Sequence, residues 1–310
     1  MKFILKITIF SIIFVMLLFG VSQIARPKNN TQECGMNNVK ASGILGEKRN
    51  SIDVLVIGDS EAFSAISPLQ IFEDSGIPVY TSASGRQLLY RSIDYLEMAL
   101  EKQKIKMIIL ETNNIFSNYS YFKYAADRIG NIFPIIKYNT FWKTENIKYI
   151  GKAAEYTWTD DFKGFHVLKH IDPSPDKDYM KPSDGEQKIN KLNKEHILYI
   201  NQLAKENGAK LVFLSTPSTL NWNMEKHNSV VKLAKEMEVD YIDLNLIDIG
   251  IDWDKDTYDK GDHVNYTGAK KVTSYLTQYL KDTNQFEDQR DNVKYRKWKK
   301  ALKRYHAEIQ

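Results

Sequence analysis

The chain is poor in cysteine, because Cys34 is the only one among its 310 residues. A single cysteine excludes an intramolecular disulfide, so the fold does not depend on one. Cys34 does not follow a lipobox-like Leu-Ala-Gly run, and we therefore interpret it as an ordinary residue rather than a lipid attachment site. The sequence also lacks CxxC pairs, zinc-finger spacing and a P-loop. We accordingly expect no metal and no cofactor.

The chain also has little excess charge. It carries 43 basic and 39 acidic residues, a formal net charge of +4, which does not indicate a nucleic-acid partner. Hydrophobic residues make up 43% and charged residues 26%, as in ordinary globular proteins. Once an N-terminal segment and a tail are set aside, the length suits one large α/β domain of roughly 230 residues.

Charge is absent from one long stretch near the N-terminus. After Lys2 and Lys6 the sequence holds no charged residue up to Ala25, which is about the length that spans a bilayer. The residues before Ala25 are Gln23 and Ile24, which make a poor signal-peptidase site. We therefore expect residues 1–25 to be an uncleaved signal anchor rather than a cleaved signal peptide. The rest of the chain would then be extracytoplasmic, with the polar residues 26–50 as a linker.

Apolar runs and helical patterns alternate through most of the remaining sequence. We expect strands at 52–57, 79–80, 106–110, 210–214 and 240–244. We expect helices at 64–74, 88–104, 186–207, 229–237 and 268–280. This alternation predicts an α/β domain over residues 51–283, with a central parallel sheet and helices on both faces. Ligands of such sheets bind at the carboxyl ends of the strands.

Two segments depart from this alternation. Residues 115–185 are rich in aromatics, and we expect an insertion that covers one end of the sheet and packs a small core of its own. A few of these aromatics, Trp158 among them, could line a groove for sugar rings. The tail, residues 284–310, predicts a basic helix with Tyr295, Trp298, Leu302 and Tyr305 on one face. That helix either lies on an anionic membrane or acidic polymer, or packs its Trp on the domain.

Gly58-Asp59-Ser60 follows the first predicted strand, so the Ser60 hydroxyl is expected at the ligand-binding edge of the sheet. A serine nucleophile needs a histidine base that a carboxylate orients. Of the six histidines, only His263 lies in a polar stretch with carboxylates close by, between Tyr258 and Ala269. Two carboxylates are candidates to orient it, Asp259 and Asp262. Adjacent residues of an extended loop point in opposite directions, so we prefer Asp259, reached through a one-residue bulge.

Four short blocks, in this order, resemble the SGNH (GDSL-type) hydrolase superfamily. They are Gly58-Asp59-Ser60, Gly85 after the second strand, Thr112-Asn113-Asn114, and Asp262-His263-Val264-Asn265 with a following Gly-Ala. The resemblance covers residues about 52 to 280 and implies a three-layer α/β/α sandwich. It implies Ser60 as the nucleophile and His263 as the base. It also implies an oxyanion hole formed by the N–H groups of Ser60 and Gly85 and by the Asn113 side chain.

The chain departs from the family's pattern at two positions. Glu111 stands where the family usually has Gly, and Lys260 stands where it has the carboxylate three residues before the histidine. A charged Glu111 pointing inward would oppose a developing oxyanion, so it either faces away or holds a substrate hydroxyl. We therefore group Glu111 with Asp59, Thr112 and Trp158 as candidate substrate contacts.

The anchor and the insertion narrow the expected role. A similar layout is seen in extracytoplasmic partners of membrane-bound O-acyltransferases, which modify alginate, cell-wall polymers or teichoic acids. The resemblance implies an O-acyltransferase, with acetyl as the expected group. Its partners would be a polysaccharide acceptor and a membrane-bound O-acyltransferase that donates the acyl group. Two alternatives stay open, a carbohydrate esterase of the same fold and a non-catalytic polysaccharide-binding scaffold.

Overall fold

The computed structural model describes residues 2–138 and 152–310. It divides into two compact units, each of which is built from two stretches of chain. The smaller unit comprises Met1–Val39 and Tyr119–Trp158, and the larger comprises Lys40–Asn118 and Thr159–Gln310.

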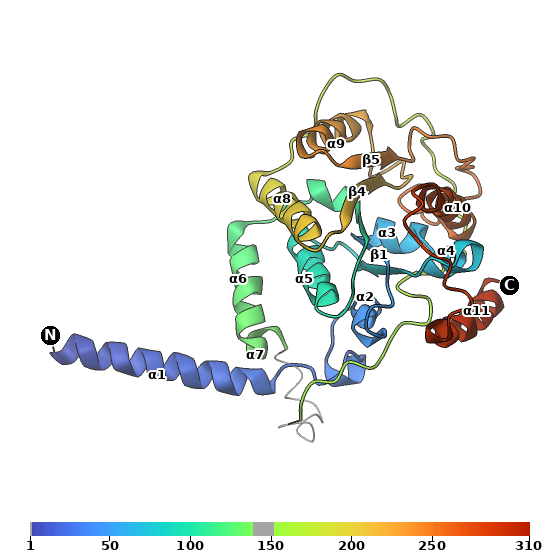
Figure 1. Ribbon diagram of the computed structural model, residues 1–310. Coiled ribbons are helices and arrows are strands. Elements are labelled where there is room, and N and C mark those ends of the chain that lie inside the picture. Colours follow the sequence, from blue (N-terminus) through green and yellow to red (C-terminus); the bar gives the residue numbers. More distant parts are fainter. Residues whose placement is uncertain (1, 139–151) are drawn as a thin grey trace. The chain divides into compact units, whose positions relative to one another are not determined.

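The larger unit is built on a five-stranded sheet in the order β2-β1-β3-β4-β5, and each neighbouring pair of strands is parallel (Figure 1). Gly58 pairs with Ala83, and Ile57 pairs with Leu110, so the carboxyl ends of the central strands lie level. The strands are β1 (Val54–Gly58), β2 (Val79–Ala83), β3 (Met107–Glu111), β4 (Lys210–Ser215) and β5 (Asp240–Asp243).

Helices cover both faces of this sheet. Every residue of β1, β2 and β3 is buried, which requires cover on both sides. One group of helices consists of α5 (Leu89–Leu100) and α8 (Lys191–Glu206), and α9 (Met224–Met237) lies against β5. A second group consists of α3 (Ser60–Ala65), α4 (Pro68–Ser75) and α10 (Tyr266–Asp282). The predicted α/β fold with a central parallel sheet is confirmed.

Helix starts differ from the predicted ones where polar caps decide them. The helix predicted over 64–74 is two helices, because Ser67 caps α4 and Pro68 is its first residue. Proline has no N–H to donate, and the residues before it favour extended backbone. Asn190 caps α8 five residues later than expected, and Asn223 caps α9 five residues earlier.

The predicted linker is only in part a linker. It contains η1 (Gln32–Cys34), α2 (Val39–Ser42) and η2 (Gly43–Gly46). Ile44 and Leu45 are buried in the larger unit, where the Lys102 ammonium donates to the Leu45 carbonyl at 2.6 Å. Burial of these apolar side chains moves the start of the sheet domain from residue 51 to about residue 40.

The stretch predicted as an insertion is divided between the two units. It holds η3 (Asn113–Phe116), α6 (Tyr121–Ile132) and α7 (Pro134–Lys137), and its residues 139–151 lie outside the described part of the chain. From Thr159 onward the chain belongs to the sheet unit. There Phe165 is fully buried, with its ring centroid 6.4 Å from that of Tyr305. These aromatics therefore help to pack the sheet unit against its own C-terminal helix.

That helix is α11 (Arg296–Ile309), which follows η6 (Val293–Tyr295). Trp298 is 2% exposed, and its indole N–H donates to Glu47 Oε2 at 3.2 Å. The buried Lys163 ammonium donates to Glu47 Oε1 at 2.8 Å and lies 5.1 Å from the Trp298 ring centroid. Of the two interpretations of the tail, the structure shows the one in which its Trp packs on the domain.

The smaller unit begins with α1 (Lys2–Ile24), a helix of 23 residues. Its length, and a mean hydropathy of 2.6 over its most apolar 18-residue window, make it a candidate membrane span near the N-terminus, as a membrane anchor or a signal sequence would be.

Candidate active site

Ser60 is the first residue of α3, directly beyond the end of β1. Asp59 caps this helix, because its Oδ1 accepts the Glu61 N–H at 3.1 Å. Gly58 is required at the strand end, since a Cβ there would lie 2.7 Å from Glu111 Cβ and 2.9 Å from Ala62 Cβ. Strand, cap and helix together hold the half-buried Ser60 at the carboxyl edge of the sheet.

His263 lies on the second arm of a β-hairpin that was not expected from the sequence. Thr257 pairs with Val264 in an antiparallel bridge, and the Tyr258 N–H donates to the His263 carbonyl at 2.9 Å. Lys260 and Gly261 form the two-residue loop, with φ angles of 60° and 93°. Two positive φ angles in a two-residue hairpin loop are typical of a type I′ turn. The turn carries the chain back on itself, so Asp259 lies beside His263.

The hairpin decides which carboxylate meets the imidazole. Asp259 Oδ2 lies 2.8 Å from His263 Nδ1, and Asp259 Oδ1 accepts the His263 N–H at 2.7 Å. Asp262 Oδ1 is farther from the same nitrogen, at 3.7 Å. The expected preference for Asp259 agrees with this geometry, but the expected one-residue bulge is wrong. A complete turn, Lys260-Gly261, supplies the extra residue.

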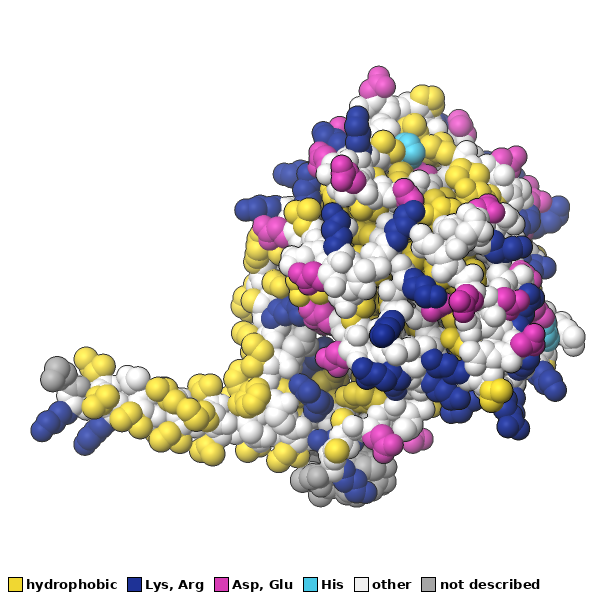
Figure 2. Space-filling view, in the orientation of Figure 1, with side chains coloured by type: hydrophobic (Ala, Val, Ile, Leu, Met, Phe, Trp, Pro, Cys, Tyr) yellow, Lys and Arg dark blue, Asp and Glu magenta, His cyan; other side chains and the backbone are white. Residues whose placement is uncertain are grey.

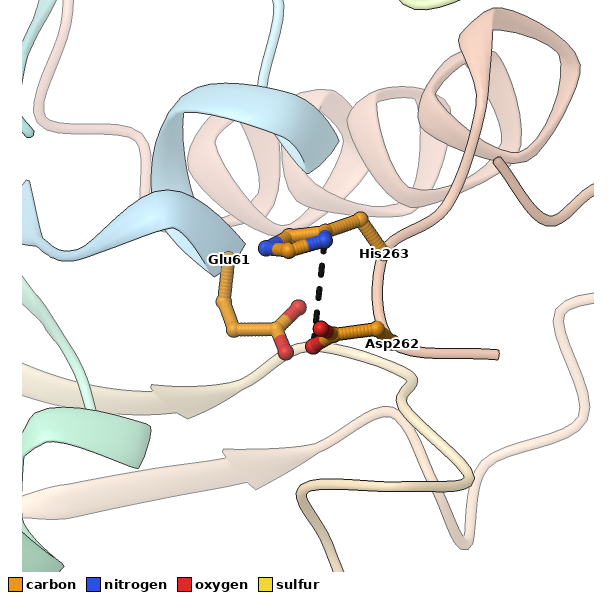
Figure 3. A group of neighbouring side chains, drawn as sticks. All are labelled: Glu61, Asp262 and His263. Atoms are coloured by element: carbon orange, nitrogen blue, oxygen red, sulfur yellow. Dashed lines mark ion pairs between the residues drawn. The ribbon is translucent and has the colours of Figure 1, made fainter. Parts of the chain in front are cut away.

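Nε2, the second imidazole nitrogen of His263, is buried from solvent and has no hydrogen-bond partner among the described residues, so Ser60 Oγ is not bonded to it in this structure. Figure 3 shows one ring nitrogen turned to Asp262 and the other turned toward α3, the helix that carries Glu61. Catalytic hydrogen bonds are often long without substrate and shorten in the substrate complex.

The hairpin is fixed to the loop after β4. The Gly261 carbonyl accepts hydrogen bonds from the Thr219 N–H at 2.8 Å and the Ser218 hydroxyl at 3.1 Å. A Cβ on Gly261 would overlap Thr219 Oγ1 and would lie 2.7 Å from Ser174 Oγ. Glycine is therefore needed there both for its φ and for the close approach of the loop.

Two further residues at the site, Glu61 and Asn221, were not expected from the sequence. Glu61 is 1% exposed, its Oε1 accepts the Asn221 amide at 2.7 Å, and the same amide donates to Asp262. Glu61, Asp262 and His263 offer ligand atoms that lie within 4.8 Å of one another. The Asn221 amide holds the two carboxylates together through its N–H groups. Glu61 could have been suspected from the sequence because it directly follows Gly-Asp-Ser. Asn221 could not, because it lies in a loop that has no periodic pattern.

Three buried carboxyl groups lie under the site. Burial raises the pKa of Asp59, and burial, with each group's acidic neighbours, raises the pKa of Glu61 and Glu111 well above the usual range. Lys226 is the cation that faces all three, and its burial lowers its own pKa. Glu61 and Glu111 therefore keep their protons at pH values where an exposed Glu is ionised. A protonated Glu111 carries no negative charge, so it would not repel a developing oxyanion as a charged Glu111 would.

Two of the groups predicted to form the oxyanion hole, the Gly85 N–H and the Asn113 side-chain amide, follow the carboxyl ends of β2 and β3. Gly85 is exposed two residues beyond Ala83, the partner of Gly58 in the register. Asn113 begins η3, and its Nδ2 donates to Asp59 Oδ2 at 3.1 Å. A side-chain amide has two N–H groups, so one donor of Asn113 is already used to position the cap of α3.

Most of the candidate substrate contacts are internal. Asp59 is 5% exposed and caps α3, while Glu111 is 1% exposed and accepts the Asn113 N–H at 3.1 Å. Thr112 is fully buried, with its hydroxyl 2.6 Å from Ser215 Oγ. These three support the wall of the site instead of facing a ligand. Trp158 belongs to the smaller unit, where its N–H is bonded to Asn30, and it is not among the side chains that the larger unit brings together here.

Two other histidines are explained by packing or by a buried network. His166 stacks on Phe63 with ring centroids 4.0 Å apart, and burial lowers its pKa to about 4. His227 Nδ1 lies 2.7 Å from Asp243 Oδ2, which also accepts the Tyr241 hydroxyl at 2.9 Å. Tyr241 in turn contacts Ser215 Oγ at 2.9 Å. This network joins the ends of β4 and β5, and the Trp222 indole N–H, next to Asn221 in the chain, donates to Asp243 Oδ2 at 3.0 Å.

Comparison with known proteins finds similarity in structure alone. No family model and no curated protein matches the sequence. Solved structures that are similar include a protein of Slackia heliotrinireducens described as an SGNH hydrolase (11% identity, TM-score 0.43). A lipase/acylhydrolase of Enterococcus faecalis (12%, 0.41) and a GDSL-like lipase of Bacteroides thetaiotaomicron (10%, 0.40) are also similar. The three cover 74%, 75% and 74% of this chain, and 100%, 97% and 88% of their own chains, respectively.

These structurally similar proteins are SGNH and GDSL hydrolases. At such identities and TM-scores the similarity carries no weight for activity, so the function must come from the side chains described above.

Replacing Gly261 by Ala tests the hairpin. We expect Gly261→Ala to lower the free energy of unfolding by more than Gly250→Ala does. Gly250 also has positive φ, 76°, but no atom lies within 4 Å of its Cβ position. Gly250→Ala should cost about 1–2 kcal/mol for its backbone conformation, and Gly261→Ala about 1–3 kcal/mol more for the overlap. Urea unfolding of the detergent-solubilised chain measures both, and equal losses would contradict the close approach.

Replacing Glu61 by Gln tests the buried carboxyl. The pKa of Glu61 is higher in the folded chain than the ~4.3 of an unfolded chain. Its contribution to stability is therefore complete below pH ~4.3 and is lost as the pH rises through the folded pKa, by about 1.4 kcal/mol per unit of elevation. We expect Glu61→Gln to be more stable relative to the wild type at pH 8 than at pH 5.

Urea unfolding at the two pH values provides the measurement, with Glu308→Gln, at an exposed position of α11, as the control. A wild type and a Glu61→Gln variant that lose the same stability between pH 5 and pH 8 would refute a raised Glu61 pKa.

Proposed function

We propose that this chain is an acyl-transfer enzyme in which Ser60 is the nucleophile, His263 the base and Asp259 the residue that orients the base. The observation that carries the proposal is the state of His263. Asp259 binds its Nδ1 at 2.8 Å, while Nε2 is shielded, has no partner among the described residues and is turned toward the helix that begins at Ser60. This is the arrangement that a serine nucleophile requires of its base.

The first half-reaction forms an ester on Ser60. His263 Nε2 takes the hydroxyl proton while Ser60 Oγ attacks the carbonyl carbon of the acyl donor. The N–H groups of Ser60 and Gly85, with the second N–H of the Asn113 amide, stabilise the oxyanion. The bond from the carbonyl carbon to the donor oxygen then breaks, and His263 returns the proton to that leaving oxygen. Asp259 keeps Nδ1 protonated and stabilises the imidazolium throughout.

The second half-reaction transfers the acyl group. A hydroxyl of the acceptor gives its proton to His263 Nε2 and attacks the carbonyl carbon of the acyl-enzyme. The bond to Ser60 Oγ breaks, and Oγ takes the proton back. With water as the acceptor the same steps make an esterase.

We infer that the acceptor is an exported polysaccharide, that the acyl group is acetyl, and that a membrane-bound O-acyltransferase supplies it. Support comes from α1, whose length and hydropathy suit an anchor that holds the catalytic unit outside the cytoplasm. It also comes from the similar layout, an N-terminal anchor followed by a domain of this fold, that extracytoplasmic partners of such acyltransferases have. A carbohydrate esterase uses the same site chemistry and is the second candidate. A non-catalytic scaffold is disfavoured by the intact Asp259–His263 pair.

Replacing Ser60 by Ala tests the nucleophile. Detergent-solubilised full-length protein incubated with p-nitrophenyl acetate and quenched in acid should carry one acetyl group on the peptide with Ser60. Mass spectrometry should find none in Ser60→Ala. Addition of oligosaccharide acceptors should then yield acetylated glycan at the expense of free acetate. Release of acetate alone at every acceptor concentration would identify an esterase, and unchanged polymer acylation in Ser60→Ala cells would identify a scaffold.

Replacing each aspartate by Asn tests which one orients the base. In Asp259→Asn the new side-chain amide could still accept the His263 backbone N–H, but it would present its own N–H to Nδ1, which favours the wrong tautomer. We expect Asp259→Asn to lower kcat by about 10²–10⁴-fold and Asp262→Asn to lower it less. Steady-state kinetics with p-nitrophenyl acetate measures both variants, after circular dichroism has confirmed that each is folded. A larger loss in Asp262→Asn would reverse the assignment.

A further inference from the structure

α6 in the smaller unit presents an apolar stripe to its surroundings. Phe122 is 84% exposed, Ile129 is 48% exposed and Ile132 is 54% exposed. With the exposed Ala125 and Ala126, these residues recur at the spacing of one helix face, and Ile136 of α7, 52% exposed, continues the stripe. Such a stripe normally packs on a core, but of the α6 residues only Gly130 is buried.

The end of α1 holds this pair of short helices. The Phe19 and Phe133 rings meet edge to face with centroids 6.3 Å apart. The Ile135 N–H donates to Ser22 Oγ at 2.9 Å, and the Gln23 amide donates to the Ile132 carbonyl at 3.4 Å. The junction of α6 and α7 is therefore attached to the last two turns of α1.

These turns lie where a membrane-spanning α1 would leave the hydrocarbon. The 23 residues of α1 rise roughly 35 Å at 1.5 Å each, against a hydrocarbon thickness of about 30 Å. With Lys2 and Lys6 at the far end, the turns near Ser22 and Gln23 reach the opposite interface. α6 runs crosswise to α1 in Figure 1, as a helix lying in the plane of a membrane would.

The apolar stripe also faces the appropriate side. In Figure 2 the hydrophobic side chains of α1 are followed by further hydrophobic side chains along α6 and α7, on the side from which α1 extends. The opposite face of α6 carries the polar Tyr124, Asp127 and Asn131, none of them fully exposed. Lys123, exposed beside the stripe, can extend its ammonium to anionic headgroups.

We propose that α6 and α7 lie in the outer interface of the bilayer, with Phe122, Ile129, Ile132 and Ile136 in the acyl-chain boundary. The occupant of this face is lipid, because the same unit contains the apolar helix that would hold it against the membrane. Interfacial helices have such an apolar face and bury it about 5–10 Å deep. The chain would then be attached to the membrane twice, by the membrane-spanning α1 and by the interfacial pair α6 and α7, here called the collar. This inference rests on α1 as the membrane span and not on the chemistry of Ser60.

Site-specific fluorescent labels can test the collar in the full-length protein. In a Cys34→Ser background a single cysteine is placed at Phe122, Ile129, Asp127 or Ile12. Each protein is reconstituted into vesicles of phosphatidylcholine and phosphatidylglycerol (3:1) and is labelled with an environment-sensitive dye. Quenching by lipids that carry a doxyl group near the headgroup or deep in the chain reports depth, and iodide reports exposure to water.

We expect the labels at positions 122 and 129 to be quenched at least threefold more by shallow doxyl lipid than the label at position 127, which lies on the opposite helix face. The label at position 12, inside α1, should be quenched best by deep doxyl lipid. The collar would be overturned if iodide quenches the labels at positions 122 and 129 and doxyl lipid does not, even if the label at position 12 is quenched by deep doxyl lipid. An aqueous position 12 would overturn it by removing the span, and neither result bears on acyl transfer at Ser60.

Discussion

The hydrogen bond between His263 and Asp259 is the interaction on which the candidate site depends, and a turn creates it. Lys260 and Gly261 adopt positive φ, so the chain reverses within two residues and returns His263 to Asp259. Both oxygens of Asp259 are used, one on the imidazole and one on the backbone N–H. The carboxylate thus stands four residues before the histidine instead of three without loss of contact, because the turn absorbs the additional residue.

The same turn links His263 to the rest of the carboxyl edge. The Gly261 carbonyl holds the loop after β4, and that loop supplies Asn221, whose amide joins Asp262 to Glu61 on α3. Hydrogen-bonded residues therefore connect the hairpin that carries His263 to α3. Burial raises the pKa of Glu61 well above its usual range, so this carboxyl keeps its proton at pH values where an exposed Glu is ionised.

The parts of this arrangement that could be predicted are those that strands fix. Buried parallel strands read as short apolar runs, so the sheet, Ser60 at the end of β1 and Asn113 after β3 could all be located from the sequence. The hairpin at Lys260 could not, because Lys is not a usual residue for positive φ. Nor could the packing of the tail, since the bond from Trp298 to Glu47 joins residues 251 positions apart. Such partners are selected by tertiary burial, which leaves no local pattern.

Under the proposed function, transfer and hydrolysis would be separated by which hydroxyl reaches His263 Nε2 after the acyl-enzyme has formed. Nε2 is shielded from solvent, so neither water nor a sugar hydroxyl reaches it without displacing surrounding groups. A polysaccharide that is already bound through its other sugar units loses little further entropy when one of its hydroxyls attacks the acyl-enzyme. Water gains no such advantage. The residues at Ser60 are the same in both cases, so acceptor binding, and not a change in the catalytic residues, separates a transferase from an esterase on this fold.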